Sequence, residues 1–368
     1  MTRSTVDSAR LDVLLRRVKL EVETGVLPSV QTAVALDGEL IAFETWGDAD
    51  PSTRYVLQSA GRPIVAGVVW KLISDGLLDV SRTVASYIPE FATNGKDAVT
   101  VEQTLTHVGG FPLAPLAYPQ MCERSRRLEA FSKWRLTYEP GTRLEFHLTS
   151  AAWVVAELCE RLTGHPIDEY LRTELTGPLG LDSIEIGPSV AAQSNVAPFT
   201  LVGVEPGNQA EISPWGPWYL ARPEVLAAGE PSHSIVSNAA DLTLWYQALM
   251  RSSLWRRDVV EDSLRIRVTL PVEGERGGTR SVPGNVALFV AVAGDDGIQR
   301  AFLPVTGSPS TFGHGGAPSQ VAFADPETGL SFAFLTNGYP DTGYEQTRAG
   351  LNRILNIGNL AADCIVSG

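Results

Sequence analysis

The chain has 368 residues, of which 44% are hydrophobic and 19% charged, and its formal net charge is −13. This length and composition predict a globular protein with one large domain or two interleaved domains. The negative charge argues against nucleic acid or an anionic membrane as the main partner, because both require a basic face. No apolar run reaches the ~18–20 residues of a membrane span, so we expect no membrane partner.

An amphipathic helix is expected first, over residues 8–23. The N-terminal segment carries charges throughout and lacks the apolar centre of a signal peptide, so we expect a cytoplasmic protein. The three cysteines, Cys122, Cys159 and Cys364, share no CxxC or CxxH spacing. A disulfide framework or a zinc site is therefore not expected, and buried free thiols are the simpler interpretation. We predict no metal and no cofactor.

A β-hairpin is predicted next, because residues 30–38 and 40–48 alternate in polarity around an Asp-Gly turn. An apolar stripe at helical spacing predicts a helix over residues 62–75, and Pro63 suits its first turn. The following pattern is mainly helical, with long loops rich in proline and glycine. Its clearest helices are expected at residues 149–164 and 238–250, and a loop is expected at residues 213–224.

Strand patterns return near the end of the chain, at residues 286–294, 319–325 and 330–337, and a last helix is expected over residues 342–356. Strands at both ends and helices between them predict an α/β fold. We expect residues 1–80 and 267–368 to form an α/β domain with a central antiparallel sheet. Residues 81–266 would form an inserted, mainly helical region.

The stretch YVLQSAGRPIVAG, residues 55–67, places Ser59 where an extended segment turns into a helix. There the helix dipole and nearby N–H groups can stabilise an oxyanion. A serine hydroxyl is a weak nucleophile without a base. Arg62, one helical turn later, can hold an anion or orient Ser59, but a guanidinium does not take up a proton. Taken alone, the pair also fits an N-cap serine and a surface arginine.

Residues 55–91 resemble the nucleophile segment of the serine β-lactamase and penicillin-binding-protein superfamily. The similar branch contains class C β-lactamases, D-alanyl-D-alanine carboxypeptidases and related esterases and acyltransferases. That segment carries Ser-x-x-Lys, a helix, a Gly-Leu-Asp turn and Tyr-Leu-Pro-Glu-Phe; here LLDV and SYIPEF stand at matching distances. Four further segments match in the same order, at residues 99–112, 139–164, 234–245 and 312–337. The resemblance implies an antiparallel sheet flanked by helices, an inserted mainly helical region, and an active-site cleft between them.

The chain departs from this family at its motifs. The family's Tyr-x-Asn aligns with Phe146, His147 and Leu148, so neither the tyrosine base nor the asparagine is present. With Arg62 in place of lysine, both proton acceptors of the usual mechanism are missing. A common Gly-Gly pair is replaced by His233 and Ser234. We interpret this clustering of changes as a remodelled site.

The third family motif, Lys/His-Thr/Ser-Gly, aligns with His314, Gly315 and Gly316. His314 is a form seen among the esterases. Gly316 retains the close backbone approach that an oxyanion donor needs, whereas the middle hydroxyl is lost at Gly315.

Histidine is the remaining side chain suited to proton transfer near neutral pH. The candidate bases are His314, His233 and His147, and the sequence leaves the choice between them open. His107 is expected to have a structural role, as the family resemblance suggests, and His165 to be a surface residue.

An apolar pocket is the expected binding site. Phe146 and Leu148 would form its floor. Trp215, Trp218 and Tyr219 would either wall it or pack beneath a proline-rich loop. Together with Arg62 and the histidines, such a pocket suits a hydrophobic small molecule that carries an anionic or carbonyl group. The sequence does not indicate an oligomeric state.

Three functions remain open. The first is a hydrolase or acyltransferase in which Ser59 attacks an ester, thioester or amide. The second is a repurposed, non-covalent enzyme that performs a cyclisation, isomerisation or elimination in the same cleft. The third is a binding protein with an inactive site. An arginine-rich, lysine-poor composition is compatible with secondary metabolism. Penicillin hydrolysis is not expected, because it needs an efficient deacylation base.

Overall fold

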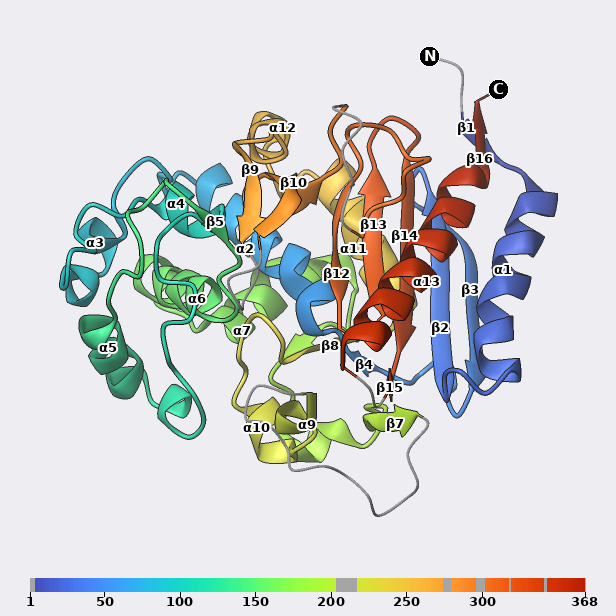
Figure 1. The fold of residues 1–368 in the computed structure, drawn as a ribbon, viewed down its shortest axis with the longest axis horizontal. Coiled ribbons are helices and arrows are strands. Elements are labelled where there is room, and N and C mark those ends of the chain that lie inside the picture. The colour runs from blue at the N-terminus through green and yellow to red at the C-terminus, as the bar shows by residue number, and fades with distance from the viewer. Residues whose placement is uncertain are drawn as a thin grey trace.

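A nine-stranded sheet forms the centre of the computed structural model, which describes residues 4–202, 217–273, 279–295, 302–317, 319–340 and 343–367. Its strand order is β3-β2-β14-β13-β12-β11-β10-β9-β5 (Figure 1). Neighbouring strands are antiparallel, except that β5 and β9 are parallel. The strands are β2 (Ser29–Leu36), β3 (Glu39–Gly47), β5 (Leu144–Glu145), β9 (Val268–Glu273), β10 (Thr279–Val286), β11 (Ala291–Val292), β12 (Phe312–Gly316), β13 (Gln320–Asp325) and β14 (Leu330–Thr336).

Helices cover both faces of this sheet (Figure 1). Helices α1 (Ser8–Glu23) and α13 (Gly343–Asp363) pack on one face, and α11 (Ala239–Arg251) packs on the other. The side chains of β14 alternate accordingly. Phe332 and Phe334 belong to the core beneath α1 and α13, whereas Ala333 and Leu335 belong to the larger core that includes α11. The chain ends meet where β1 (Ser4–Val6) pairs with β16 (Ile365–Ser367).

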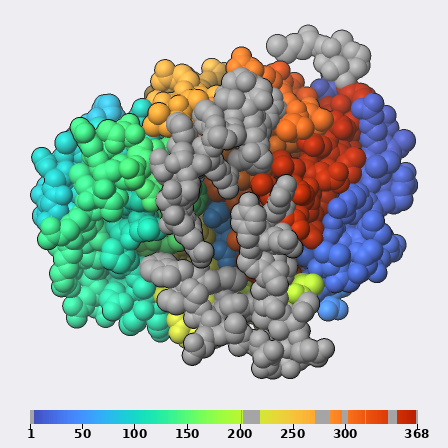
Figure 2. All heavy atoms as spheres, in the orientation of Figure 1, coloured from blue at the N-terminus to red at the C-terminus, as the bar shows by residue number. Residues whose placement is uncertain are grey.

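A helical lobe lies beside the sheet, in cyan and green in Figures 1 and 2. Its main helices are α5 (Arg124–Lys133) and α6 (Ser150–Thr163). Shorter elements complete it: α3 (Val84–Tyr87), η2 (Pro89–Phe91), α4 (Val101–Leu105), η3 (Gln120–Cys122), α7 (Ile167–Tyr170), η4 (Leu171–Thr176) and α8 (Gly177–Leu179).

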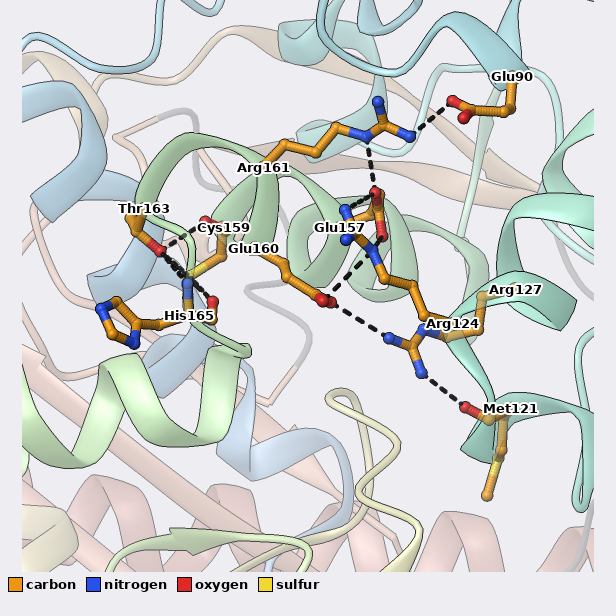
Figure 3. A network of polar contacts seen from close by, with 10 residues as sticks. All are labelled: Glu90, Met121, Arg124, Arg127, Glu157, Cys159, Glu160, Arg161, Thr163 and His165. Atoms are coloured by element: carbon orange, nitrogen blue, oxygen red, sulfur yellow. Dashed lines mark hydrogen bonds and ion pairs between the residues drawn. The ribbon is translucent and has the colours of Figure 1, made fainter.

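A buried carboxylate ties the lobe together (Figure 3). Glu157 on α6 has no exposed side-chain surface and binds Arg124 of α5 at 2.8 Å and Arg161 at 2.6 Å. Arg161 also binds Glu90 of η2 at 2.7 Å. Because both arginines reach solvent, the buried charge of Glu157 is paired at a moderate desolvation cost.

Helix α2 (Arg62–Ser74) lies between the lobe and the sheet and is buried along most of its length. Pro63 is one of its first residues, where a missing N–H costs nothing. Gly67 allows Trp245 of α11 to pack directly on the helix, since a Cβ there would lie 2.4 Å from the indole ring. Trp245 also donates from its indole nitrogen to the Pro63 carbonyl at 3.1 Å. The core thus fixes the position of α2.

The remaining elements are short. A small sheet has the order β4-β8-β6, from β4 (Tyr55–Val56), β8 (Ile235–Ser237) and β6 (Glu185–Ile186). Strand β7 (Thr200–Val202) pairs in parallel with β15 (Gly338–Pro340). The helical segments are η1 (Gln58–Gly61), η5 (Val190–Gln193), α9 (Pro217–Leu220), α10 (Pro223–Ala227) and α12 (Arg257–Ser263). None of the helices in the described ranges is long and apolar enough to cross a membrane.

The structure confirms the predicted fold class, an antiparallel sheet flanked by helices. The predicted single strand over residues 286–294 is wrong, because residues 287–290 form a turn between β10 and β11. Phe289 has φ +66° in this turn, and Leu288 accepts a hydrogen bond from the Trp70 indole. The apolar residues are buried by tertiary contacts rather than by a strand. Cys122 is also exposed, unlike the buried Cys159 and Cys364.

The predicted helical region, residues 81–266, contains strands as well. Its β5 pairs with β9 of the central sheet, and its α11 packs on β2 and β14. The division into two domains at these boundaries stays a prediction.

Candidate active site

Ser59 lies in the tight turn η1, directly before α2. Gln58, the residue before it, has φ +53°, a left-handed conformation that is uncommon outside glycine. Ser59 is half-buried, and no hydrogen bond of its hydroxyl is seen with the residues that the structure describes. This turn therefore presents an uncommitted serine hydroxyl at the positive end of a 13-residue helix.

Three strands hold the Ser59 turn in place. The Leu57 N–H donates to the Ile235 carbonyl of β8 at 2.8 Å. The Gln320 amide of β13 donates to the Val56 carbonyl at 3.0 Å. Gly316 of β12 approaches so closely that a Cβ would lie 2.5 Å from the Leu57 carbonyl oxygen. The nucleophile position is thus fixed from several directions, as preorganised catalysis requires.

Strand β12 presents a free edge near Ser59. Its neighbour β11 pairs only with Phe312 and Gly313, so His314–Gly316 has no strand partner on that side among the described residues. The opposite edge is paired with β13. Backbone N–H groups at a free edge can bind a substrate carbonyl or an oxyanion. This is the role that the sequence predicted for Gly316.

Arg62 is fully buried behind the Ser59 turn. Its Nη2 donates to the His147 carbonyl at 3.2 Å and to the Leu148 carbonyl. Its guanidinium carbon lies 4.2 Å from the centre of the Phe146 ring, a cation–π distance. Within the described ranges, its Nε and Nη1 have no hydrogen-bond partner. This excludes the alternative interpretation of the pair as an N-cap serine and a surface arginine, since the residue at the N-cap of α2 is Gly61.

Burial lowers the pKa of Arg62 to about 10, while the negative charge of Glu230 acts in the opposite direction. The guanidinium still carries its positive charge at neutral pH and does not accept a proton from Ser59. A buried cation with two free N–H-bearing nitrogens can bind an anion or a carbonyl oxygen.

His314 lies between two aromatic rings, 5.7 Å from Phe146 and 4.8 Å from Phe302 by ring centres. Its Nδ1 lies 2.7 Å from the Gly315 carbonyl, which identifies Nδ1 as the protonated nitrogen. Burial and the charge of Arg62 lower the pKa of His314 to about 3. His314 is therefore neutral and weakly basic at physiological pH, which makes it better suited to hydrogen bonding than to general-base catalysis.

His147 was predicted as a candidate base, but its ring is committed to the backbone. Its Nδ1 donates to the Glu145 carbonyl at 2.8 Å, and its Nε2 accepts from the Phe111 N–H at 3.2 Å. Burial lowers its pKa to about 3. With neither ring nitrogen available, the geometry favours a structural role for His147. His107 likewise accepts from the His147 N–H at 3.2 Å.

His233 forms a pair with Glu230. The His233 Nδ1 and Glu230 Oε2 atoms are 2.7 Å apart, and the two side chains are only 13% and 7% exposed. The second oxygen of Glu230 accepts from the Ser232 N–H at 2.8 Å. Among the hydrogen bonds of the described residues, only the Nδ1 of the His233 ring is engaged, and Nε2 is not. His165 is an exposed surface residue beside Glu169, as predicted.

The predicted binding residues differ in what they contact. A Cβ at Gly315 would lie 2.8 Å from the Phe302 ring, so this ring occupies the space of the family's middle side chain. The Tyr219 hydroxyl accepts from the Tyr118 N–H at 2.6 Å. Phe146 and Leu148 are half-buried next to Arg62. Trp215 and the side chain of Trp218 lie outside the described residues.

A cavity of about 540 Å³ lies away from Ser59, along residues 136–140 of the helical lobe.

The comparisons with known proteins agree with this geometry. The family model described as Beta-lactamase matches residues 15–356. The chain belongs to the β-lactamase family. It is 23% identical to an Escherichia coli K12 protein named "Putative D-alanyl-D-alanine carboxypeptidase", over 89% of this chain and 82% of that protein.

Solved structures of the β-lactamase family show the same fold. A penicillin-binding-protein homologue from Caulobacter crescentus superposes with a TM-score of 0.79 at 22% identity, covering 99% of this chain and 100% of the other. A family VIII carboxylesterase superposes with a TM-score of 0.77 at 20% identity, covering 96% and 99%. The predicted recognition is confirmed: the chain belongs to the β-lactamase and penicillin-binding-protein superfamily, a family of serine hydrolases that includes carboxypeptidases and family VIII esterases.

Three residues of the site escaped the sequence analysis: Glu230, Phe289 and Phe302. Glu230 stands three residues before His233, a spacing that could have suggested a carboxylate–histidine pair. Phe289, 5.3 Å from the Arg62 guanidinium carbon, was assigned to a strand. Phe302 carries no motif and is recognisable only from its contact with Gly315.

Proposed function

We propose that the protein forms an acyl-enzyme at Ser59 and acts as a hydrolase or acyltransferase on an ester, thioester or amide of a hydrophobic small molecule. The observation that carries this proposal is the Ser59 hydroxyl just before α2, which has no hydrogen bond to the described residues and lies beside the part of β12 that β11 leaves unpaired. Nucleophile and oxyanion donors are the parts of the β-lactamase machinery that the chain retains. The names of two similar proteins, a carboxypeptidase and a carboxylesterase, support carboxyl-group chemistry.

The substrate class follows from the side chains around Ser59. Phe146 and Phe302 flank His314 with aromatic surface, and Leu148 is half-buried beside them. Apolar walls with a few fixed polar groups favour an apolar acyl or alkyl group next to the reacting carbonyl. The Arg62 charge would stabilise the negative charge that develops on that carbonyl oxygen.

The test is intact-protein mass spectrometry after exposure to a fluorophosphonate and to p-nitrophenyl esters of increasing acyl length. We expect one adduct per chain on wild type, faster with longer acyl groups, and no adduct on Ser59→Ala. Ser86→Ala, which removes an exposed serine hydroxyl from the helical lobe, is the matched control and should label like wild type. An unlabelled wild-type protein, or a labelled Ser59→Ala variant, would overturn the proposal.

A second function, non-covalent catalysis in the same site, is favoured by one observation. Two nitrogens of buried Arg62, which have no hydrogen-bond partner among the described residues, can bind a substrate carboxylate or enolate without any covalent step. Under this alternative, Ser59→Ala retains the thermal stabilisation produced by a probe carboxylate such as octanoate, and Arg62→Met loses it. Under the acyl-enzyme proposal, turnover of an ester disappears in Ser59→Ala.

A further inference from the structure

The turn over residues 230–234 builds a fixed carboxylate–histidine pair. Both oxygens of Glu230 are engaged, one by His233 Nδ1 at 2.7 Å and the other by the Ser232 N–H at 2.8 Å. The Glu230 carbonyl also accepts from the Ser234 N–H at 2.8 Å and the His233 N–H at 3.2 Å. The orientation of the imidazole is thus set by a carboxylate that is itself held by the backbone. This is the supporting geometry that an efficient histidine base needs.

The chain pairing brings this turn alongside Ser59. Strand β8 runs antiparallel to β4, with Val236 opposite Val56. The pairing continues one step further, because the Leu57 N–H donates to the Ile235 carbonyl at 2.8 Å. Beyond this contact the ladder ends: the first segment turns into η1, which carries Ser59 and contacts β8, while His233 stands two residues before Ile235. A Cβ at Gly61 would lie 3.0 Å from the Ile235 side chain, so the segments stay in contact past the nucleophile.

Electrostatic coupling agrees with this placement. The charge of His233 acts on the pKa of His314, and the charge of Glu230 acts on the pKa of Arg62. The titratable and charged groups that face the pair are therefore His314 on β12, Arg62 on α2 and Tyr219 on α9.

The other candidate bases are occupied. Arg62 retains its proton, and His147 uses both ring nitrogens for the backbone. His314 is neutral with a pKa of about 3. His165 forms a similar pair with Glu169, at 3.1 Å, but this pair is exposed and joins the segment after α6 to α7. Among the histidines of the described ranges, His233 alone combines a carboxylate partner, a bonded Nδ1 and a position next to the Ser59 turn.

We propose that His233 is the general base of Ser59 and that Glu230 is its positioning residue, an inference that rests on the acyl-enzyme function proposed above. As Ser59 Oγ bonds to the acyl carbon, its proton passes to His233 Nε2, and Nδ1–H remains bonded to Glu230. The protonated imidazole then gives that proton to the leaving alkoxide, thiolate or amine. In deacylation a water or acceptor alcohol gives its proton to Nε2 and attacks the acyl carbon. The bond to Oγ breaks, and Ser59 recovers a proton from His233.

The experiment measures the rate of fluorophosphonate labelling of Ser59 by intact mass across pH 5 to 9. We expect His233→Asn to lower this rate by ~10²–10⁴ and to flatten its pH dependence. Glu230→Gln, which keeps the shape but removes the charge, should lower the rate by ~10-fold or more and displace the profile. His165→Gln, which breaks the surface pair, is the matched control and should label like wild type.

Rescue separates chemistry from folding. Free imidazole should restore part of the labelling rate of a folded His233→Gly variant, whose melting temperature is measured alongside, and should not accelerate Ser59→Ala. If His233→Gly does not fold, the shifted pH profile of Glu230→Gln decides the question.

The two proposals fail in different ways. A wild-type protein without a Ser59 adduct overturns the acyl-enzyme function and this inference with it. A wild-type protein that labels at Ser59, while His233→Asn labels at the same rate with the same pH profile, overturns only the assignment of the base.

Discussion

Mild acid should destabilise this protein through its buried histidines. The pKa values of His147 and His314 are lowered to about 3 by burial, against an unfolded value of about 6.5. Between these pH values the unfolded chain binds more protons than the folded one, so the free energy of unfolding falls as the pH falls. Each histidine contributes a slope of about 1.4 kcal/mol per pH unit, or about 2 kcal/mol lost by pH 5. The burial of His107, whose pKa is also well below its ordinary value, adds to the effect.

The size of this loss makes it measurable. Together, His147 and His314 remove about 4 kcal/mol at pH 5, from a total that is roughly 5–15 kcal/mol for a typical domain. The assay is urea unfolding followed by tryptophan fluorescence at several pH values between 4.5 and 7.5. His314→Gln should reduce the slope of stability against pH by about 1.4 kcal/mol per pH unit. Exposed His165→Gln should leave the slope unchanged.

One result would refute the reasoning. If His314→Gln loses stability in acid as steeply as wild type, His314 is protonated in the folded protein. The site would then hold an imidazolium beside Arg62, and His314 would become an acid rather than a neutral hydrogen-bonding group.

Three further substitutions test the packing around the site. Gly67→Ala should lower the free energy of unfolding, measured in urea, by about 1–3 kcal/mol, because the new methyl group would clash with Trp245. This loss should outweigh the better helix propensity of alanine. An unchanged urea midpoint would contradict the close packing of Trp245 on the helix. Glu157→Ala should lower the free energy of unfolding by about 2 kcal/mol. The loss is limited because Arg161, once freed from Glu157, can still reach water. A loss below the error of the measurement would show that this network of ion pairs does not stabilise the fold. Gly316→Ala should slow the labelling of Ser59 by ~10²-fold, because the added methyl group would displace the turn that carries the nucleophile. Circular dichroism should show little loss of secondary structure. A variant that labels as fast as wild type would refute the close approach of Gly316 to this turn.

Much of the fold could be predicted because its signals are local. The alternating segments around the Asp-Gly turn became β2 and β3, and the apolar stripe after Pro63 became α2. The apolar run over residues 286–294 misled because its periodicity does not reveal its partners. Trp70 and Leu105 bond to Leu288 and Phe289 in the turn and bury it, so apolar residues occur there without a strand. Such a turn is stabilised by residues far away in the sequence, which a local pattern cannot show.

The candidate site was predictable in its residue types but not in its geometry. The motif positions directed attention to Ser59, Arg62 and His314, and the structure brings these residues together. Counting histidines could not show which ring nitrogens are free. His147 stands in a motif, yet its bonds to the backbone use both nitrogens, whereas His233 stands outside the catalytic motifs and has a carboxylate partner. That distinction depends on the turn at Glu230, which carried no family signal.

The arginine at position 62 and the phenylalanine at position 146, which replace the family's lysine and tyrosine, are in contact and depend on each other. A buried guanidinium needs compensation, and the Phe146 face supplies a cation–π contact at 4.2 Å, worth up to about 2 kcal/mol when desolvated. A tyrosine at position 146 would have no proton acceptor in Arg62, so its hydroxyl would bring no catalytic advantage there. Once the guanidinium is permanent, the positive charge behind Ser59 can stabilise an oxyanion but cannot relay a proton. The proton must then leave on another side of the nucleophile. The β8 side, where histidine and serine stand in place of two glycines, is the side on which this chain has added polar groups.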